Sequence, residues 1–112
     1  SAAAREDVMA LRVRVCSLDD IADGELRAFP VQGVTWPVIV TRVEGALIAV
    51  PGVCPHEDVE LATGELRDGA IVCAGHGYSF DLTTGRCTHD ASLELRRYPI
   101  TLVDRDVWVD LL

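Results

Sequence analysis

The sequence predicts an all-β protein, an antiparallel β-sandwich or partial barrel with a ligand-bearing subdomain inserted into it. Three observations predict this class. Apolar and polar residues alternate in many short runs, which is the period of strands. Turn signals such as Glu44-Gly45 and Asp68-Gly69 separate the runs. Almost no segment has a helical period, so roughly nine or ten short strands are expected to pair into antiparallel sheets.

The first half of the chain carries the clearest strand pattern. Residues 11–16 (LRVRVC) alternate strictly, and Ser17 can cap a single turn over residues 17–21. Glu44-Gly45 supplies a tight turn between two apolar runs, which predicts a hairpin. The strands expected here cover residues 11–16, 25–31, 37–43 and 46–50.

The second half is interrupted by a loop. Pro51-Gly52 ends the strand pattern, and residues 53–62 have no clear period. Asp68-Gly69 then turns the chain into a new strand, and residues 83–85 make the next turn. The strands expected in this half cover residues 70–73, 78–82, 93–102 and 107–109.

Two short segments inside this interruption each bring one thiol and one imidazole together. They are Cys54-Pro55-His56 and Cys73-Ala74-Gly75-His76, with residues 57–72 between them. Structural zinc sites usually pair Cys with Cys and His with His, whereas each segment here mixes the two. The mixed order fits a binuclear cluster in which each segment gives its Cys to one iron and its His to the other. A zinc-stabilised interaction module remains the alternative.

The remaining cysteines allow a second interpretation of the chain. Four Cys in a short sequence could form two disulfides in a secreted domain. The N-terminus shows no basic segment followed by an apolar stretch, so we expect no signal peptide and a reducing, cytoplasmic location. Cys16 is then expected to be a buried thiol and Cys87 a half-buried one. Residues 1–8 read as a disordered tail or vector remnant, which leaves one domain over residues 9–112.

The charge of the chain excludes some partners. The formal net charge is −8, and all ten basic residues are Arg. Such acidity argues against nucleic acid and against an anionic membrane surface. It suits brief docking on a basic partner, but on charge alone the simpler interpretation is that it keeps the protein soluble. No apolar run is long enough for a transmembrane helix. Acidic residues beside the first Cys/His segment are candidates for the docking face; they are Glu57, Asp58 and Glu60.

The two segments, with Gly77 after the second His, resemble the ligand motif of the Rieske family. The run Phe80-Asp81-Leu82-Thr83-Thr84-Gly85 is similar to that family's F-D-x-x-T-G hairpin, and weaker similarity covers nearly all of residues 11–110. The resemblance implies a Rieske fold with a cluster-binding subdomain over about residues 51–87 and one [2Fe–2S] cluster. It also implies that Cys54 and Cys73 bind the buried iron, and that His56 and His76 bind the outer iron.

The chain departs from the branch of this family found in cytochrome bc complexes. That branch has an extra disulfide, but Val59 and Gly75 occupy its positions here. Its Ser and Tyr that hydrogen-bond the cluster sulfurs correspond to Tyr78 and Phe80. Because Phe80 has no hydroxyl, a potential near the low end of the Rieske range, about −150 mV, is expected.

The segment after the second Cys/His pair also departs from the family. Many relatives cover the cluster with a proline-containing loop, but no Pro lies between Pro55 and Pro99. Residues 87–93 could cover it in another way. His89, in this segment, is expected to be an exposed loop residue, with a place near the cluster edge or beside Asp90 as the alternative.

The resemblance implies an electron carrier of an oxygenase system. It would pass single electrons from an NAD(P)H-dependent flavin reductase to a terminal oxygenase, either a ring-hydroxylating dioxygenase or a diiron monooxygenase, and act as a monomer in transient complexes. We do not expect an enzyme. A mononuclear iron site needs two His and a carboxylate, only His89 is left over, and no dinucleotide fingerprint is present. A non-catalytic subunit resembling the small subunit of nitrite reductase is the alternative.

Overall fold

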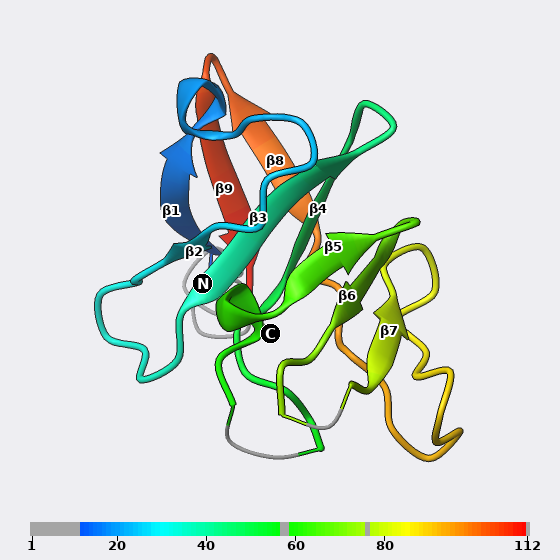
Figure 1. Cartoon of the computed structure of the whole chain (residues 1–112). Coiled ribbons are helices and arrows are strands. Elements are labelled where there is room, and N and C mark those ends of the chain that lie inside the picture. Colours follow the sequence, from blue (N-terminus) through cyan, green and yellow to red (C-terminus); the bar gives the residue numbers. More distant parts are fainter. Residues whose placement is uncertain (1–11, 57–58, 76, 112) are drawn as a thin grey trace.

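The structure, a computed structural model, describes residues 12–56, 59–75 and 77–111 and confirms the expected all-β class. Its strands form three antiparallel sheets, in the orders β1-β9-β8, β2-β3-β4 and β5-β6-β7 (Figure 1). The elements are β1 (Arg12–Ser17), η1 (Leu18–Asp20), β2 (Ala28–Phe29), β3 (Val38–Val43), β4 (Ala46–Pro51), η2 (Leu61–Thr63), β5 (Glu65–Arg67), β6 (Ala70–Val72), β7 (Ser79–Asp81), β8 (Ile100–Val103) and β9 (Asp106–Asp110).

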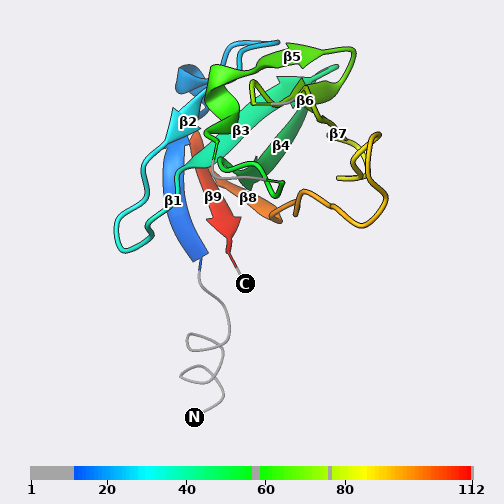
Figure 2. The same cartoon turned by 60° about the horizontal axis from the view of Figure 1, so that its bottom comes forward.

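The β3–β4 hairpin is buried on both of its faces. Alternate residues point to opposite sides of a strand, so Val38 and Val40 enter one apolar cluster while Ile39, between them, enters another. Figure 2 shows β5 and β6 over one side of this hairpin and β8 and β9 on the other. The apolar run of β3 is therefore continuous because the hairpin is a middle layer with one core on each face, as in sheets covered on both faces.

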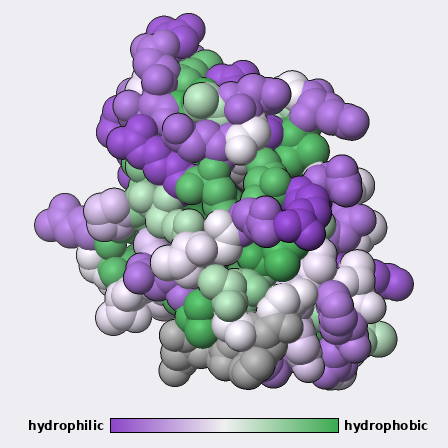
Figure 3. All heavy atoms as spheres, in the orientation of Figure 1, coloured by the Kyte–Doolittle hydropathy of each residue, from purple (hydrophilic) through white to green (hydrophobic). Residues whose placement is uncertain are grey.

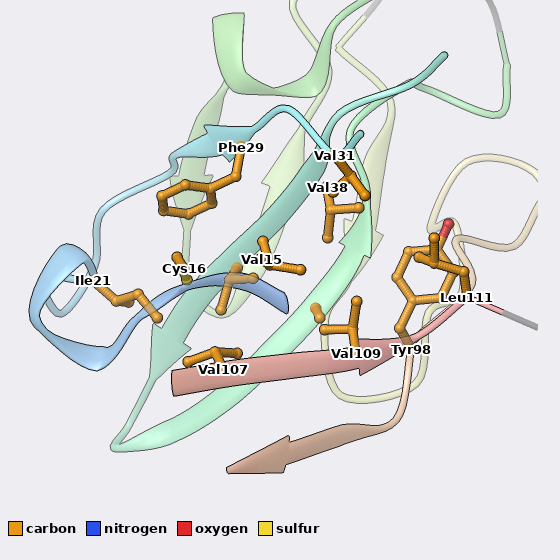
Figure 4. Packing of buried hydrophobic residues seen from close by; sticks show 12 residues of the cluster. Val15, Cys16, Ile21, Phe29, Val31, Val38, Tyr98, Val107, Val109 and Leu111 are labelled. Carbon is orange, nitrogen blue, oxygen red and sulfur yellow. The ribbon is translucent and has the colours of Figure 1, made fainter. Parts of the chain in front are cut away.

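The first core lies between the β3–β4 hairpin and the sheet made of β1, β9 and β8 (Figure 4). A bulge in β1 shapes this core. The pairing of β1 with β9 shifts between Arg14 and Cys16, so the neighbours Val15 and Cys16 are both buried. Strict alternation would have turned one of them toward solvent.

The second core lies on the other face of the hairpin and contains both cysteines of the Cys/His segments. Its remaining members are apolar side chains from β3, β4, η2, β6 and β7, together with Leu82, Cys87 and Leu95 from the chain after β7. The fully buried ones are Ile39, Val50, Leu61, Ile71, Phe80, Leu82 and Leu95. The part of the chain expected to bind a ligand is thus packed directly against the hairpin of the base.

Both Xaa-Gly turns predicted from the sequence are confirmed. Glu44 and Gly45 have φ values of 51° and 82°, and Asp68 and Gly69 have 52° and 77°. Positive φ at both central residues is the type I′ geometry that matches the twist of a two-stranded hairpin. The predicted Ser17 cap is confirmed too, since its hydroxyl accepts the Asp19 N–H at 3.2 Å.

Three strand predictions need correction. The strand expected over residues 25–31 is reduced to Ala28–Phe29; Pro30, which cannot donate a ladder hydrogen bond, follows its last residue. The one expected over residues 93–102 pairs regularly only in Ile100–Val103 and makes isolated bridges before that. β5 was missed, because Glu65-Leu66-Arg67 offers a single apolar residue to the pattern.

Hydrophilic and apolar side chains occupy different parts of the surface. In Figure 3, hydrophilic side chains cover the upper end of the molecule, where η1 and the β8–β9 turn lie, and apolar atoms show through the middle of this face. Among the residues that the structure describes, no helix has the length and apolar character needed to cross a membrane.

Candidate metal centre

The first Cys/His segment leaves the end of β4 and is closed at its base by backbone hydrogen bonds. The N–H of Cys54 donates to the Val59 carbonyl at 2.9 Å, and the N–H of Leu61 donates to the Gly52 carbonyl at 2.9 Å. Gly52 itself lies against Pro37, where a Cβ atom would come within 2.9 Å of the proline ring. The segment expected to be a loop is therefore a loop with a fixed base, followed by η2.

The second segment lies between β6 and β7 and is equally constrained. The N–H of Cys73 donates to the Tyr78 carbonyl at 2.8 Å, and the N–H of Gly77 donates to the Cys73 carbonyl at 3.0 Å. Gly77 has a φ of 72°, in the left-handed region that favours glycine. The backbone conformation of this turn thus favours glycine at position 77.

The two segments converge in one buried apolar cluster. Cys54 is 3% exposed and Cys73 is 1% exposed, and both belong to the second core. Ligand thiolates of an iron–sulfur cluster are tuned by such a shell, which excludes water and lowers the dielectric constant. The structure thus brings together the two thiols that the sequence analysis selected.

His56 lies farther out and contacts the opposite segment. It is partly exposed, and its ring stacks on Tyr78 with centroids 4.0 Å apart and planes at 24°. Tyr78 lies in the loop that carries the second segment, directly before β7, so this ring contact joins the two loops. His76 lies outside the described residues, as do Glu57 and Asp58, whereas Glu60 is exposed.

The hairpin after β7 places a third segment beside the site. The Asp81 carboxylate accepts the N–H groups of Thr83 and Thr84 at 2.7 and 3.2 Å, which closes the turn. The chain then returns along β7, with the Thr88 N–H donating to the Ser79 carbonyl at 2.9 Å. The hydrogen bonds of Asp81 are the physical basis of the F-D-x-x-T-G pattern. The return of the chain along β7 brings the next residue, His89, back to the site.

His89 is exposed, as expected, but it is not an isolated loop residue. Its ring stacks on Tyr78 with centroids 5.4 Å apart and planes at 13°. Its Nδ1 accepts the Ser79 N–H at 3.4 Å and lies 3.0 Å from the Thr88 hydroxyl. No period or spacing in the sequence could predict this stack, because the stack depends on the strand-like return of residues 86–88 along β7.

Asp90 follows in the same segment. Two hydrogen bonds from Ser92 hold the pKa of the Asp90 carboxyl below its usual range, and the charge of the nearby His56 has a smaller effect in the same direction. The carboxylate is therefore ionised at neutral pH.

The other two cysteines are free thiols, so two disulfides are not formed. Cys16 is buried in the first core, as predicted. Cys87 is 6% exposed and belongs to the second core, so the expectation that it would be half-buried was wrong. Cys87 pairs with Phe80 across the hairpin, which turns it inward.

The donor set fits an iron–sulfur cluster of the Rieske type. Buried cysteine sulfurs are soft ligands suited to iron–sulfur chemistry, and an imidazole nearer the surface suits the second iron. A family comparison agrees: the model of the Rieske [2Fe–2S] domain matches residues 12–99. The chain therefore belongs to the Rieske [2Fe–2S] family, and its cofactor is one Rieske-type cluster.

Relatives of known role are similar over most of their length. The chain is 36% identical over 99 residues to the ferredoxin component of biphenyl 2,3-dioxygenase from Rhodococcus jostii, covering 88% of this chain and 91% of that one. It is 35% identical over 89 residues to the ferredoxin component of the alkene monooxygenase system from Xanthobacter autotrophicus, covering 79% and 71%.

Solved structures agree with these relatives. The Sphingomonas yanoikuyae B1 ferredoxin superposes with a TM-score of 0.80 at 28% identity, covering 91% of this chain and all of that one. The fold is also that of a nitrite reductase small subunit from Mycobacterium tuberculosis, with a TM-score of 0.77 at 18% identity, covering 92% and 96%. The second likeness concerns the fold alone.

A third solved structure contains a partner. It is a complex of reduced oxygenase and oxidised ferredoxin in carbazole 1,9a-dioxygenase, which matches with a TM-score of 0.77 at 26% identity, covering 88% of this chain and 92% of that one.

Proposed function

We propose that this chain is the ferredoxin component of an oxygenase system, which accepts single electrons from an NAD(P)H-dependent flavin reductase and passes them to a terminal oxygenase. The observation that carries this proposal is the convergence of two buried thiols and a partly exposed imidazole from two segments of a Rieske fold. The relatives named ferredoxin components support it. The carrier role is non-catalytic, and a cytoplasmic monomer in transient complexes fits it.

We further infer the ligand set and its place in the chain. Cys54 and Cys73 would bind the inner iron, and His56 and His76 would bind the outer one. The burial of both thiols and the partial exposure of His56 support this order. Residues 51–87, which contain both segments and the β5-β6-β7 sheet, would form the cluster-binding subdomain.

The chemistry that the cluster supplies is the storage of one electron, delocalised over iron and sulfur. The side chains of this protein determine how readily it is stored. Phe80 is fully buried and offers no hydroxyl to a sulfur, so the reduced and more negative state gains little stabilisation from this position. A potential near the low end of the Rieske range, about −150 mV, follows.

Electron delivery to purified oxygenases tests the proposal. The cluster-loaded protein is reduced by NADH and a flavin reductase and mixed in a stopped-flow instrument with a ring-hydroxylating oxygenase or with a diiron hydroxylase. We expect reoxidation by one of these partners to be faster than by dissolved oxygen, with product formed only when the carrier is present. Reoxidation by neither partner, together with stable binding to a nitrite reductase catalytic subunit, would instead favour a subunit of that enzyme.

A further inference from the structure

We propose that Tyr78 and His89 are positioning residues of the electron-transfer centre: their stacked rings hold the imidazole of His56 and cover it against water. The inference rests on the assignment of His56 as a cluster ligand made above. Three rings lie in sequence, His56 against Tyr78 at 4.0 Å and Tyr78 against His89 at 5.4 Å between centroids. The interplanar angles of 24° and 13° make both contacts stacked.

The outer ring of this stack is held in place by the backbone. Thr88, just before His89, pairs with Ser79 through its N–H at 2.9 Å, and its hydroxyl donates to the same Ser79 carbonyl at 3.3 Å. Nδ1 of His89 in turn accepts the Ser79 N–H at 3.4 Å. These bonds fix the side of His89 that faces β7, so its ring is directed onto Tyr78.

The middle ring is held by its own segment. The Tyr78 carbonyl accepts the Cys73 N–H at 2.8 Å, and Ser79 begins β7 directly after it. Tyr78 is therefore fixed to a residue of the second Cys/His segment while its ring touches His56 of the first. A movement of either segment would disturb this contact.

The sequence shows why aromatic rings, and not a proline, would cover His56. No proline lies between Pro55 and Pro99, so no proline ring restricts the segment over residues 87–93. Partners of a metal-bound imidazole orient it and tune the metal, and the surrounding shell controls access of water. A cluster with two thiolates becomes more negative on reduction, and water stabilises that state. Loss of the ring cover should therefore raise the reduction potential.

Two substitutions of His89 separate the ring from its hydrogen bond. His89→Asn keeps an acceptor where Nδ1 accepts the Ser79 N–H but removes the ring. His89→Phe keeps a ring for Tyr78 but removes the acceptor. Tyr78→Leu removes the middle ring, and Tyr78→Phe is its conservative control. Each purified, cluster-loaded variant is measured by redox titration and by pulsed EPR of the imidazole nitrogen couplings, with thermal unfolding and iron content as checks of folding.

We expect His89→Asn and Tyr78→Leu to raise the potential and to broaden the nitrogen coupling of one imidazole while the other is unchanged. His89→Phe and Tyr78→Phe should match the parent. The proposal is overturned if His89→Asn matches the parent in both measurements, or if His89→Phe deviates as much as His89→Asn, since His89 would then act only as a loop tether. A parent without imidazole couplings would overturn the ligand assignment as well.

Discussion

Gly64, at the end of η2, lies so close to the backbone around Cys73 that a larger residue does not fit there. A Cβ atom built there would lie 1.9 Å from the Val72 carbonyl oxygen and 3.3 Å from the Ala74 nitrogen. Both atoms are backbone, next to Cys73, so they cannot move aside as a flexible side chain would. The end of η2 can approach the second segment this closely only as glycine.

Gly64→Ala should therefore displace the second segment. We expect a loss of unfolding free energy of about 3 kcal/mol, the upper range for overpacking, and less iron bound per chain. Thr63→Ala is the matched control, because it removes only an exposed hydrogen bond to the Glu60 carbonyl. Chemical denaturation and iron analysis of both variants test this; equal stability of Gly64→Ala and Thr63→Ala would contradict it.

Cys16 gives the protein a specific alkaline sensitivity. Burial raises the pKa of its thiol from the ordinary 9.0 to about 11, and the charge of Asp20 adds to the rise. The unfolded chain thus loses this proton at a lower pH than the folded chain does. The stability that the neutral thiol contributes is complete below pH 9 and is lost as the pH rises toward 11.

Replacing Cys16 with Val should remove this dependence. Two pH units of separation correspond to about 3 kcal/mol, so the unfolding free energy of the parent should fall by roughly that amount more than that of Cys16→Val across this range. Denaturant titrations at several pH values measure the difference between the two proteins. Parallel pH profiles would show that Cys16 ionises equally in both states.

At the scale of elements, the sequence predicted those strands and turns whose formation depends on neighbouring residues in the chain. The β3–β4 hairpin followed from two apolar runs around Glu44-Gly45, because a type I′ turn depends on those two residues alone. The strand predicted over residues 25–31 extends only over Ala28–Phe29, because its pairing depends on β3 and on Pro30, which follows it. The bulge in β1 could not be predicted from the sequence either. It lets both Val15 and Cys16 pack in the first core, and the position of that core depends on the other strands.

The turn after β7 depends on the Asp81 carboxylate. Its oxygen accepts two backbone N–H groups, and Asn can replace it with an amide oxygen while Ala cannot. We expect Asp81→Ala to lower the unfolding free energy by about 1–2 kcal/mol and Asp81→Asn by much less. Thermal or urea unfolding measures both. Equal losses would mean that the charge of Asp81, not its acceptor, matters.

At the scale of the whole molecule, the β3–β4 hairpin belongs to both the base and the ligand-bearing part. Ile39 packs in the core that holds Cys54 and Cys73, whereas Val40, the next residue, packs in the core closed by β1 and β9. Both side chains are fully buried. The two cores are therefore linked through one strand, and damage to either should lower stability.

Ile39→Ala and Val40→Ala should differ in their effect on the cluster. Both should lose about 2–4 kcal/mol of stability, because each leaves a cavity in a closed core. Only Ile39→Ala should also shift the reduction potential, since only its cavity would open in the core that contains Cys54 and Cys73. Unfolding and redox titrations of the two variants test this. A potential shift in Val40→Ala as large as in Ile39→Ala would contradict the separation of the cores.

The sequence predicted the part of the candidate site in which the metal-binding residues lie close together in the chain. Cys54, His56 and Cys73 stood out because their spacing is short and their donor types are specific. The stack of His56, Tyr78 and His89 could not be predicted, because it joins three segments through two strand pairings. The burial of Cys87 was missed for a similar reason, since it depends on the pairing with Phe80.

The central claim is that this fold holds one Rieske cluster and carries one electron at a time. An EPR-monitored redox titration of the purified protein tests it most directly. We expect a rhombic signal that grows in a single one-electron step near the low end of the Rieske range, about −150 mV. A colourless protein that contains zinc and gives no signal on reduction would contradict it.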